Sequence, residues 1–392
     1  MKNKRTILHC DLNNFYASVE CLLHPQFRNV PMAVGGDQEA RHGVVLAKNM
    51  LAKQYGIITG EPIIKAKQKC PNLVIAPPHH DLYEVYSKKA REIYARYTDK
   101  IEPFGIDECW LDVTDCFALF GDGVTIANRL RKEMREELGL TISVGVSFNK
   151  VFAKLGSDLK KPDATSVIDY EHFREIVWPL SVGDLLYVGK NTAKKLGSRG
   201  IFTIGDLAQA SPELLRRLLG KMGDMLYLYA NGLDESPVEP GGREVVNKSI
   251  GNSITTSKDL KNDEEARLLI MEIADGVAYR MRQQGYRGTV VHVVIKDKDF
   301  STITRQGQLE NPTNLGTVIG EKAWELFFKH WNWEKTVRML GVTVSGLQEG
   351  ETTEQLSFFD DPRQTEKKEH LEESLDDIKK RFGGDAIRRG IH

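Results

Sequence analysis

The stretch KIEPFGIDECWLDVT, residues 100–114, decides how the rest of the chain is interpreted. Two apolar runs flank a short polar centre, and Pro103 and Gly105 are typical turn residues, so the stretch predicts a β-hairpin or a tight corner between strands. This turn would present Asp107 and Glu108 side by side. Adjacent carboxylates repel one another, and an enclosed pair needs a nearby cation or a shared proton. A solvated acidic turn is the alternative when this stretch is taken alone.

A third carboxylate, Asp11, follows the apolar run TILHC at Thr6–Cys10, which predicts a short buried strand. The chain then has the pattern of a helix that begins near Asn13. Three carboxylates from two neighbouring strands suit a pair of Mg²⁺ ions, because these ions prefer oxygen ligands. Two such ions can hold the attacking and the leaving oxygen of a phosphoryl transfer. The spacing alone does not establish that the three side chains meet in space.

Length and composition narrow the class of protein. A chain of 392 residues predicts roughly two to four domains and a large core. The net charge of −1 shows no overall bias towards nucleic acid, although one basic face is compatible with that sum. The five cysteines form no C-x-x-C pair, so we expect free thiols in a reducing cytoplasm. Without a visible signal peptide or membrane-spanning run, we expect a cytoplasmic protein with no membrane partner.

Strand and helix patterns alternate through residues 1–168, which predicts an α+β unit around one sheet, with residues 13–78 inserted after the first strand. The expected helices are Asn13–Leu23, Lys48–Tyr55, Pro62–Lys69, Asp81–Tyr97, Thr125–Leu138 and Asn149–Lys160, and the expected strands include Met32–Gly35 and Thr141–Phe148. Residues 169–236 are helical in pattern. The Pro/Gly-rich stretch Glu235–Gly242 then predicts a linker.

The C-terminal part of the chain predicts a second, smaller unit in which two helices cover one sheet. The expected strands are Lys248–Gly251, Val290–Ile295, Ser301–Thr304 and Val337–Ser345, and the expected helices are Glu264–Gln284 and Leu315–His330. Residues 360–392 are highly charged, with a helical pattern around Glu366–Arg381 and no readable role.

Three motifs occur in order along the chain: LHCDLNNFYASVE (8–20), GIDECWLDVT (105–114) and SVGVSFNKVFAKLGSDLKKP (143–162). Together they resemble the Y-family translesion DNA polymerases, and in particular the bacterial DinB/UmuC group, over residues 5–350. The resemblance implies an α+β, right-hand multidomain fold. Its parts would be a palm (1–12 and 79–168), fingers (13–78), a thumb with a helix-hairpin-helix (169–236), a linker (237–247), a little finger (248–350) and a charged tail (351–392).

The resemblance also implies a function, which is template-directed, error-prone translesion synthesis in DNA damage tolerance and repair. It assigns Asp11, Asp107 and Glu108 as ligands of two Mg²⁺ ions, with Mn²⁺ as the alternative ion and the Leu12 carbonyl as a further ligand. The ions would activate the primer 3′-hydroxyl and neutralise charge on the α-phosphate and the leaving pyrophosphate of a dNTP. An open site with few contacts to the new base pair implies low fidelity.

The same match assigns residues that bind the nucleotide. Tyr16 falls at the steric gate, where its ring would exclude a 2′-hydroxyl; a core tyrosine is the alternative. Phe15 matches a nucleotide-packing position, and Lys161 matches a lysine that binds the triphosphate.

The chain departs from the family pattern at two positions in the fingers. Met50 and Lys53 stand where Tyr and Arg are frequent, so phosphate binding would depend on Lys53, Lys161 and Arg41. Gly105 replaces a frequent serine, which removes a hydroxyl but no metal ligand.

DNA contacts are expected in two later segments. VGKNTAKKLGSRGI, Val188–Ile201, resembles a helix-hairpin-helix, in which backbone N–H groups bind a DNA phosphate without reading sequence. The candidate DNA-binding residues are Gly189, Lys190 and Lys194 here, and Lys248, Ser249, Arg287 and Arg305 in the little finger. A simple helix cap at Gly189 and ordinary surface charge are the alternatives.

The tail contains two adjacent phenylalanines, which are costly to leave in water. Gln355, Leu356, Phe358 and Phe359 match the pattern that binds the bacterial sliding clamp (β clamp); packing of the rings on the chain's own surface is the alternative. The expected partners are therefore primer–template DNA, a dNTP and the clamp, and we expect a monomer.

Two other functions compete with this interpretation. A non-catalytic paralogue could bind DNA and the clamp and recruit another polymerase, but it would be expected to lose metal carboxylates, and all three are present. A palm-fold nucleotidyl cyclase would explain neither the helix-hairpin-helix nor the clamp motif.

Overall fold

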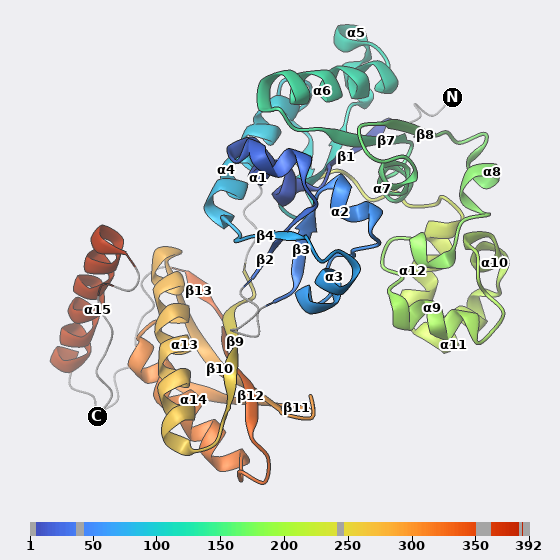
Figure 1. Cartoon of the computed structure of the whole chain (residues 1–392). Helices are drawn as coiled ribbons and strands as arrows, with labels where there is room; N and C mark the ends of the chain where they lie inside the picture. Colours follow the sequence, from blue (N-terminus) through green and yellow to red (C-terminus); the bar gives the residue numbers. More distant parts are fainter. Residues whose placement is uncertain (1–4, 37–42, 241–246, 350–361, 384–385, 387–392) are drawn as a thin grey trace. The chain divides into compact units, whose positions relative to one another are not determined.

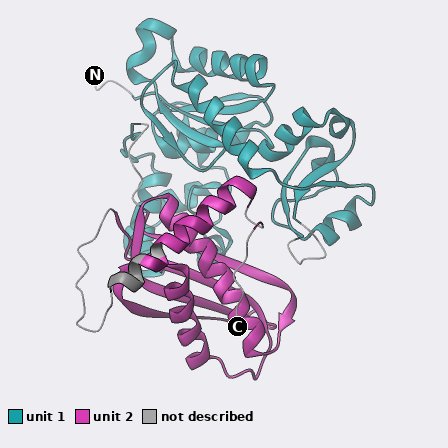
Figure 2. Cartoon of the chain, turned by 90° about the vertical axis from the view of Figure 1, so that its left-hand side faces the viewer, with its two compact units in different colours: residues 1–38, 43–244 teal, residues 39–42, 245–392 magenta. Residues whose placement is uncertain are grey.

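A computed structural model describes residues 5–36, 43–240, 247–349, 362–383 and 386, except for the side chains of 362–366 and 369 (Figure 1). The chain divides into two compact units, one of residues 1–38 and 43–244 and the other of residues 245–392 (Figure 2). Helices and sheets occur in both units, so the predicted α+β class is confirmed.

A five-stranded sheet with the order β5-β6-β1-β7-β8 lies in the first unit. Its strands are β1 (Ile7–Leu12), β5 (Ile101–Pro103), β6 (Glu108–Asp112), β7 (Ile142–Ser147) and β8 (Thr165–Ile168). β5 and β6 pair antiparallel, which confirms the predicted hairpin. β1 lies between β6 and β7 and is antiparallel to both, so the apolar run before Asp11 is a central, buried strand.

The two faces of this sheet have different partners, because side chains alternate along a strand. One face contributes Leu8, Cys10 and Leu12 to a core shared with α1 (Phe15–Leu23), α4 (His80–Tyr94) and α6 (Gly123–Leu138). On the opposite face, where α7 (Lys150–Leu159) packs, Ile7 meets Ala153. His9 and Asp11 alternate with Leu8 and Cys10 and therefore face α7.

Helix α7 lies unusually close to β7 because Gly145 has no side chain. A Cβ atom at this position would lie 1.9 Å from the carbonyl oxygen of Ala153 and 2.5 Å from the backbone nitrogen of Ser157. Both separations are far inside van der Waals contact. The glycine of the SVGVSF stretch therefore sets the distance between α7 and the sheet.

Residues 13–78 add a second sheet, of order β3-β2-β4, to the first unit. Its elements are the 3₁₀ helix η1 (Pro25–Asn29), β2 (Met32–Gly35), β3 (Val45–Lys48), α2 (Met50–Gln54), α3 (Ile63–Lys69) and β4 (Val74–Ala76). Two helix starts were predicted two residues too early. Helix α1 begins at Phe15 because Asn14 has a left-handed backbone, with φ 49°. Helix α2 begins after Asn49, whose side chain accepts a hydrogen bond from the Ala52 N–H and so caps the helix.

Residues 169–236 are helical, as the sequence pattern predicted. The helices of this region are α8 (Phe173–Val177), η3 (Val182–Asp184), α9 (Lys190–Gly197), α10 (Ile204–Gln209), α11 (Pro212–Leu219) and α12 (Lys221–Ala230). Two short helices, η2 (Thr114–Cys116) and α5 (Phe117–Phe120), lie earlier in the chain, between β6 and α6. The core of this helical region includes Phe152 and Leu155 of α7. Val238 packs against Ile7 and Trp110, so the first residues of the predicted linker are still packed on the first unit.

The second unit contains a four-stranded sheet of order β11-β10-β12-β9. Its elements are β9 (Ser249–Leu260), α13 (Asp263–Gln283), β10 (Tyr286–Asp297), β11 (Thr302–Thr313), α14 (Gly316–His330), β12 (Val337–Ser345) and β13 (Gln348–Glu349). Helices α13 and α14 share one apolar core with this sheet, which confirms the predicted arrangement of two helices on a sheet.

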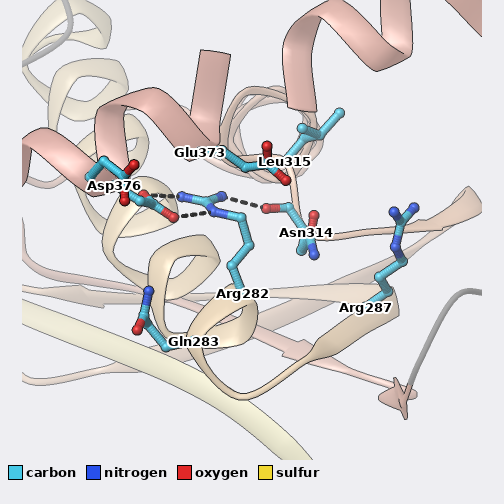
Figure 3. Close-up of a pocket in the computed structure, with 8 residues that line it drawn as sticks. Arg282, Gln283, Arg287, Asn314, Leu315, Glu373 and Asp376 are labelled. Carbon is cyan, nitrogen blue, oxygen red and sulfur yellow. Dashed lines mark hydrogen bonds and ion pairs between the residues drawn. The ribbon is translucent and has the colours of Figure 1, made fainter. Parts of the chain in front are cut away.

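A final helix, α15 (Pro362–Phe382), is attached to the second unit through Arg282 of α13. The Arg282 guanidinium donates to the two carboxylate oxygens of Asp376 at 2.6 and 2.8 Å, and to the carbonyl of Asn314 at 2.8 Å (Figure 3). It also lies 3.3 Å from Glu372. Asp376 and Glu372 are buried, so this ion pair network is largely shielded from water. The helical pattern seen in the charged tail is therefore confirmed, over a longer range than predicted.

Two further predictions concern the cysteines and membrane-spanning helices. All five cysteines are free thiols, as predicted. Among the helices that the structure describes, none is long and apolar enough to cross a membrane.

Candidate active site

The hairpin and β1 bring the three predicted carboxylates to one end of the large sheet. Asp11 and Glu108 are Cα partners across β1 and β6, so their side chains project from the same face. The backbone N–H of Leu12 donates to the Asp107 carbonyl at 3.0 Å, which holds the hairpin corner against the end of β1. Gly105 supports the corner with φ 90°, a conformation that favours glycine.

Two lysines lie against these carboxylates. Lys161 Nζ is 2.7 Å from Asp11 Oδ2 and 2.8 Å from Asp158 Oδ1. Lys154 Nζ is 2.5 Å from Glu108 Oε2. Both ammonium groups come from α7 or the residues just after it, so the close approach of α7 to the sheet brings them to the acidic residues.

His9 is a further neighbour of Glu108. It is fully buried on β1, with Nε2 3.3 Å from Glu108 Oε2 and Nδ1 2.8 Å from the Ser157 hydroxyl oxygen. Its ring lies edge-on to Trp110 at 5.3 Å. The imidazole is therefore held between α7 and the sheet, where it limits the positions open to Glu108.

Burial raises the pKa values of the acidic groups, whereas nearby positive charges lower them. Burial raises the pKa of Asp11 to about 7 despite the contact with Lys161. Burial, together with the charge of Glu108, also raises the pKa of Asp107. Burial would raise the pKa of Glu108 too, but its contacts with His9 and Lys154 lower it to about 2. The raised pKa values of the two aspartates show that their charged forms are poorly solvated in this site, and a bound cation would stabilise those charged forms.

The chemistry of these donors fits a divalent cation, since carboxylate oxygens are the ligands that hard cations prefer. Within the described ranges, however, no three His, Cys, Asp or Glu side chains are arranged so that they could hold a metal ion. The ammonium groups of Lys154 and Lys161 instead neutralise Glu108 and Asp11 in this structure.

Tyr16 lies on α1, four residues after Leu12, and contacts Tyr83 of α4. Burial and, to a lesser extent, the negative charge of Asp107 raise the pKa of its hydroxyl. Its ring stacks on Tyr83, with centroids 4.1 Å apart and planes 12° apart, and the ring is half-buried. Phe15 is buried beside it, at 5.6 Å between ring centroids. Tyr16 is therefore a partly accessible ring that is packed on the first turn of α4 and follows β1 closely in the chain.

The other predicted nucleotide-binding residues in the fingers region are exposed or lie outside the described residues. Lys53 lies exposed on α2, close enough to Lys48 that its charge adds to burial in lowering the Lys48 pKa. Met50, at the start of α2, is also exposed. Arg41 lies outside the described residues.

The predicted DNA-binding residues are mostly exposed. Gly189 is the N-cap of α9, with Lys190 and Lys194 on the helix, and a Cβ at Gly189 would meet nothing within 4 Å. In the second unit, Lys248, Ser249 and Arg305 are exposed, whereas Arg287 is half-buried and lines a pocket next to α15 (Figure 3). The predicted clamp-binding residues, Gln355 to Phe359, lie outside the described residues.

The sequence interpretation missed His9 and Lys154 as members of the site. Lys154 carries a readable signal, because Lys150, Lys154 and Asp158 recur at intervals of four and so share one face of α7. Lys150 Nζ contacts Glu102 at 2.6 Å, next to the contact between Lys154 and Glu108. His9 carries no such signal, since a histidine within an apolar strand is also typical of a core.

Comparisons with known proteins identify the family. A family model described as "impB/mucB/samB family" matches residues 10–158, and the model of its C-terminal domain matches residues 247–358. A model described as "DNA polymerase-iota, thumb domain" matches residues 183–234. These three matches cover the regions that carry the sheet, the helical region and the second unit.

Relatives and a solved structure agree with these matches. The chain is 52% identical to a DNA polymerase IV of Acetivibrio thermocellus over 99% of this chain and 97% of that protein. It is 38% identical to DNA polymerase IV 1 of Bacillus subtilis, over 98% and 92% of the two chains. A solved Y-family DNA polymerase chimera, Dbh-Dpo4(243-245)-Dbh, shares the fold, with a TM-score of 0.77, 24% identity and coverage of 88% of this chain and all of the other. The chain therefore belongs to the Y family of DNA polymerases, in its DinB group, and is a DNA-directed DNA polymerase.

Proposed function

We propose that this polymerase adds dNTPs to a primer 3′-hydroxyl, opposite damaged as well as intact DNA templates, by two-metal-ion nucleotidyl transfer. The observation that carries the proposal is the pairing of Asp11 with Glu108 at the sheet end where Asp107 also lies. Family membership supports dependence on a divalent metal and use of DNA and dNTPs as substrates. The raised pKa values of Asp11 and Asp107, which burial causes, add to this support because a bound cation would stabilise the two charged carboxylates.

The three carboxylates and the Leu12 carbonyl would hold two Mg²⁺ ions, with Mn²⁺ as the alternative. When bound, such ions favour deprotonation of the primer hydroxyl and neutralise charge on the transferred phosphate. Lys161, once released from Asp11, is available to a triphosphate at the same end of the sheet. Lys53 and Arg41 would add charge from the fingers. Tyr16 would hold its ring beneath the sugar, and Phe15 would pack beside it.

The domain assignments follow the same proposal. The large sheet is the palm (1–12 and 79–168), residues 13–78 are the fingers, and residues 169–236 are the thumb. The sheet with α13 and α14 is the little finger (248–350), joined by the linker 237–247. Template–primer DNA would contact the exposed backbone at Gly189 and the exposed basic residues of both units. We further propose a monomeric, cytoplasmic enzyme.

Primer extension tests the catalytic proposal. Wild-type protein is expected to extend a primer on an undamaged template and past an abasic site in the presence of Mg²⁺, and to stop when the metal is chelated. The Glu108→Ala variant is expected to lose nucleotide addition by about a thousandfold, because a metal ligand is absent, while binding primer–template DNA with similar affinity.

The same assay separates this proposal from its main competitor. A wild-type chain that binds DNA but adds no nucleotide with Mg²⁺ or Mn²⁺ would favour the recruiting paralogue. A Glu108→Ala variant as active as wild type would instead remove the acidic hairpin from the mechanism.

We also propose that Gln355, Leu356, Phe358 and Phe359 bind the bacterial sliding clamp. The support is the sequence pattern and its place between the little finger and α15. Replacing Phe358 and Phe359 together by alanine is expected to abolish retention on immobilised clamp and to leave extension without clamp unchanged. Equal retention of variant and wild type would refute this part of the proposal.

A further inference from the structure

Glu20 is a buried carboxylate with no part in the acidic centre. It lies on α1, one turn after Tyr16 and on the same face of the helix, and it is fully buried. Its Oε1 accepts a hydrogen bond from the Tyr83 hydroxyl at 2.5 Å and lies 2.9 Å from His79 Nδ1. Burying a carboxylate is costly unless it is hydrogen-bonded, and an apolar side chain could fill the same space. The hydrogen bonds therefore point to a role for Glu20 beyond packing.

Tyr83 connects Glu20 to the ring of Tyr16. It is fully buried in the first turn of α4. Burial and the hydrogen bond to Glu20 raise the pKa of Tyr83 well above its usual value, so its hydroxyl stays a donor. One end of the ring is thus fixed by Glu20, and one of its faces stacks on Tyr16. His80 meets both rings edge-on, each at 5.8 Å between centroids.

We infer that Glu20 is a positioning residue that, through Tyr83, fixes the ring of Tyr16 and so sets how strictly ribonucleotides are excluded. The inference rests on the proposed role of Tyr16 as the steric gate. A gate rejects a 2′-hydroxyl only to the extent that its ring cannot move away, because discrimination is a difference between two binding free energies. The stacked Tyr83 ring blocks that movement, and the Glu20 hydrogen bond resists displacement of Tyr83.

Three substitutions separate the hydrogen bond from the ring and from the charge. Tyr83→Phe keeps the ring and removes the donor, Glu20→Leu removes the acceptor at similar size, and Glu20→Gln keeps an acceptor without the charge. The measurement is the ratio of kcat/KM for a dNTP to that for the matching rNTP in primer extension. We expect this ratio to fall about five- to tenfold in Tyr83→Phe and Glu20→Leu, the size expected for one hydrogen bond. Glu20→Gln should keep most of it.

A double variant and a matched control test whether the effect comes from this particular hydrogen bond. Glu20→Leu combined with Tyr83→Phe should lower the ratio no further than either change alone, because both remove the same hydrogen bond. Tyr97→Phe is the control, since the Tyr97 hydroxyl also donates to a glutamate, Glu133, within the same core but outside the gate. Its ratio should equal that of wild type.

The outcomes distinguish this inference from the function on which it rests. An inactive wild type would refute the proposed reaction and the inference with it, and a Tyr16→Ala variant with unchanged sugar discrimination would refute the gate. If both of these hold, an unchanged ratio in Tyr83→Phe overturns the inference. Equal losses of dNTP and rNTP incorporation also overturn it, because a merely structural role lowers both. Should Glu20→Leu fail to fold, Tyr83→Phe decides alone, since it preserves the packing.

Discussion

The Asp11→Asn variant is expected to lose nucleotide addition by about a thousandfold while remaining folded. Asparagine keeps the shape of the side chain but removes the charge that a metal ligand needs. Because burial raises the pKa of Asp11 to about 7, the charged carboxylate is unfavourable in its surroundings without metal. Its removal should therefore leave the melting temperature unchanged or slightly higher. Steady-state primer extension and thermal unfolding measured on the same preparation check both parts.

Asp158→Asn provides the control for this experiment. Asp158 contacts the same lysine, with its Oδ1 2.8 Å from Lys161 Nζ, but its side chain is half exposed. We expect its activity to fall by less than about tenfold, in line with the small effect of exposed ion pairs. An Asp11→Asn variant within tenfold of wild type would show that Asp11 is not a metal ligand. A large fall in both variants would instead point to the position of Lys161 as the common cause.

The Gly145→Ala variant is expected to be destabilised by about 3 kcal/mol, the upper end of ordinary overpacking costs. The new Cβ would lie 1.9 Å from the Ala153 carbonyl oxygen, so α7 and β7 must move apart. Because α7 carries Lys154, activity should fall as well, even at temperatures where the variant is folded. Chemical denaturation and primer extension at low temperature measure the two effects.

Gly183→Ala is the matched control for this prediction, since it makes the same change in the same unit. A Cβ at Gly183 would lie 3.5 Å from the Ser181 hydroxyl, which is ordinary contact. Its stability should stay within about 0.5 kcal/mol of wild type. If Gly145→Ala is equally stable, the helix does not depend on this glycine for its position, and the packing argument fails.

Most elements of the fold were predictable because they depend on local sequence, but β9 (Ser249–Leu260) and β11 (Thr302–Thr313) extend well beyond the short strands predicted there. The hairpin around Asp107 has turn residues between two apolar runs, and the strand before Asp11 is a mostly apolar run that contains His9. Helix starts were less predictable, since asparagine suits several roles. Asn14 takes a left-handed backbone, whereas the side chain of Asn49 caps a helix. The residue type alone does not indicate which of these roles an asparagine takes, so it does not fix the first residue of the helix.

The contacts inside the site could not be predicted from the sequence, for a different reason. Lys161 and Asp11 are 150 positions apart, and their 2.7 Å contact depends on the path of α7 across the sheet. No periodicity in one sequence specifies that path. Glu20 is a second example, because a glutamate on an amphipathic helix is normally expected at the surface. Its burial follows from Tyr83 and His79, which approach from another helix.

The attachment of α15 to Arg282 limits how far the proposed clamp-binding residues can lie from the second unit. The segment 350–361 starts after β13 and ends at α15, and both of these elements belong to the second unit. A fully extended chain spans at most about 3.5 Å per residue, so these residues have a contour length of about 40 Å. A segment held at both ends can project only about half of its contour, roughly 20 Å, from its anchors. Release of α15 from Arg282 would about double this radius and so lower the effective concentration of the proposed clamp-binding residues near the second unit.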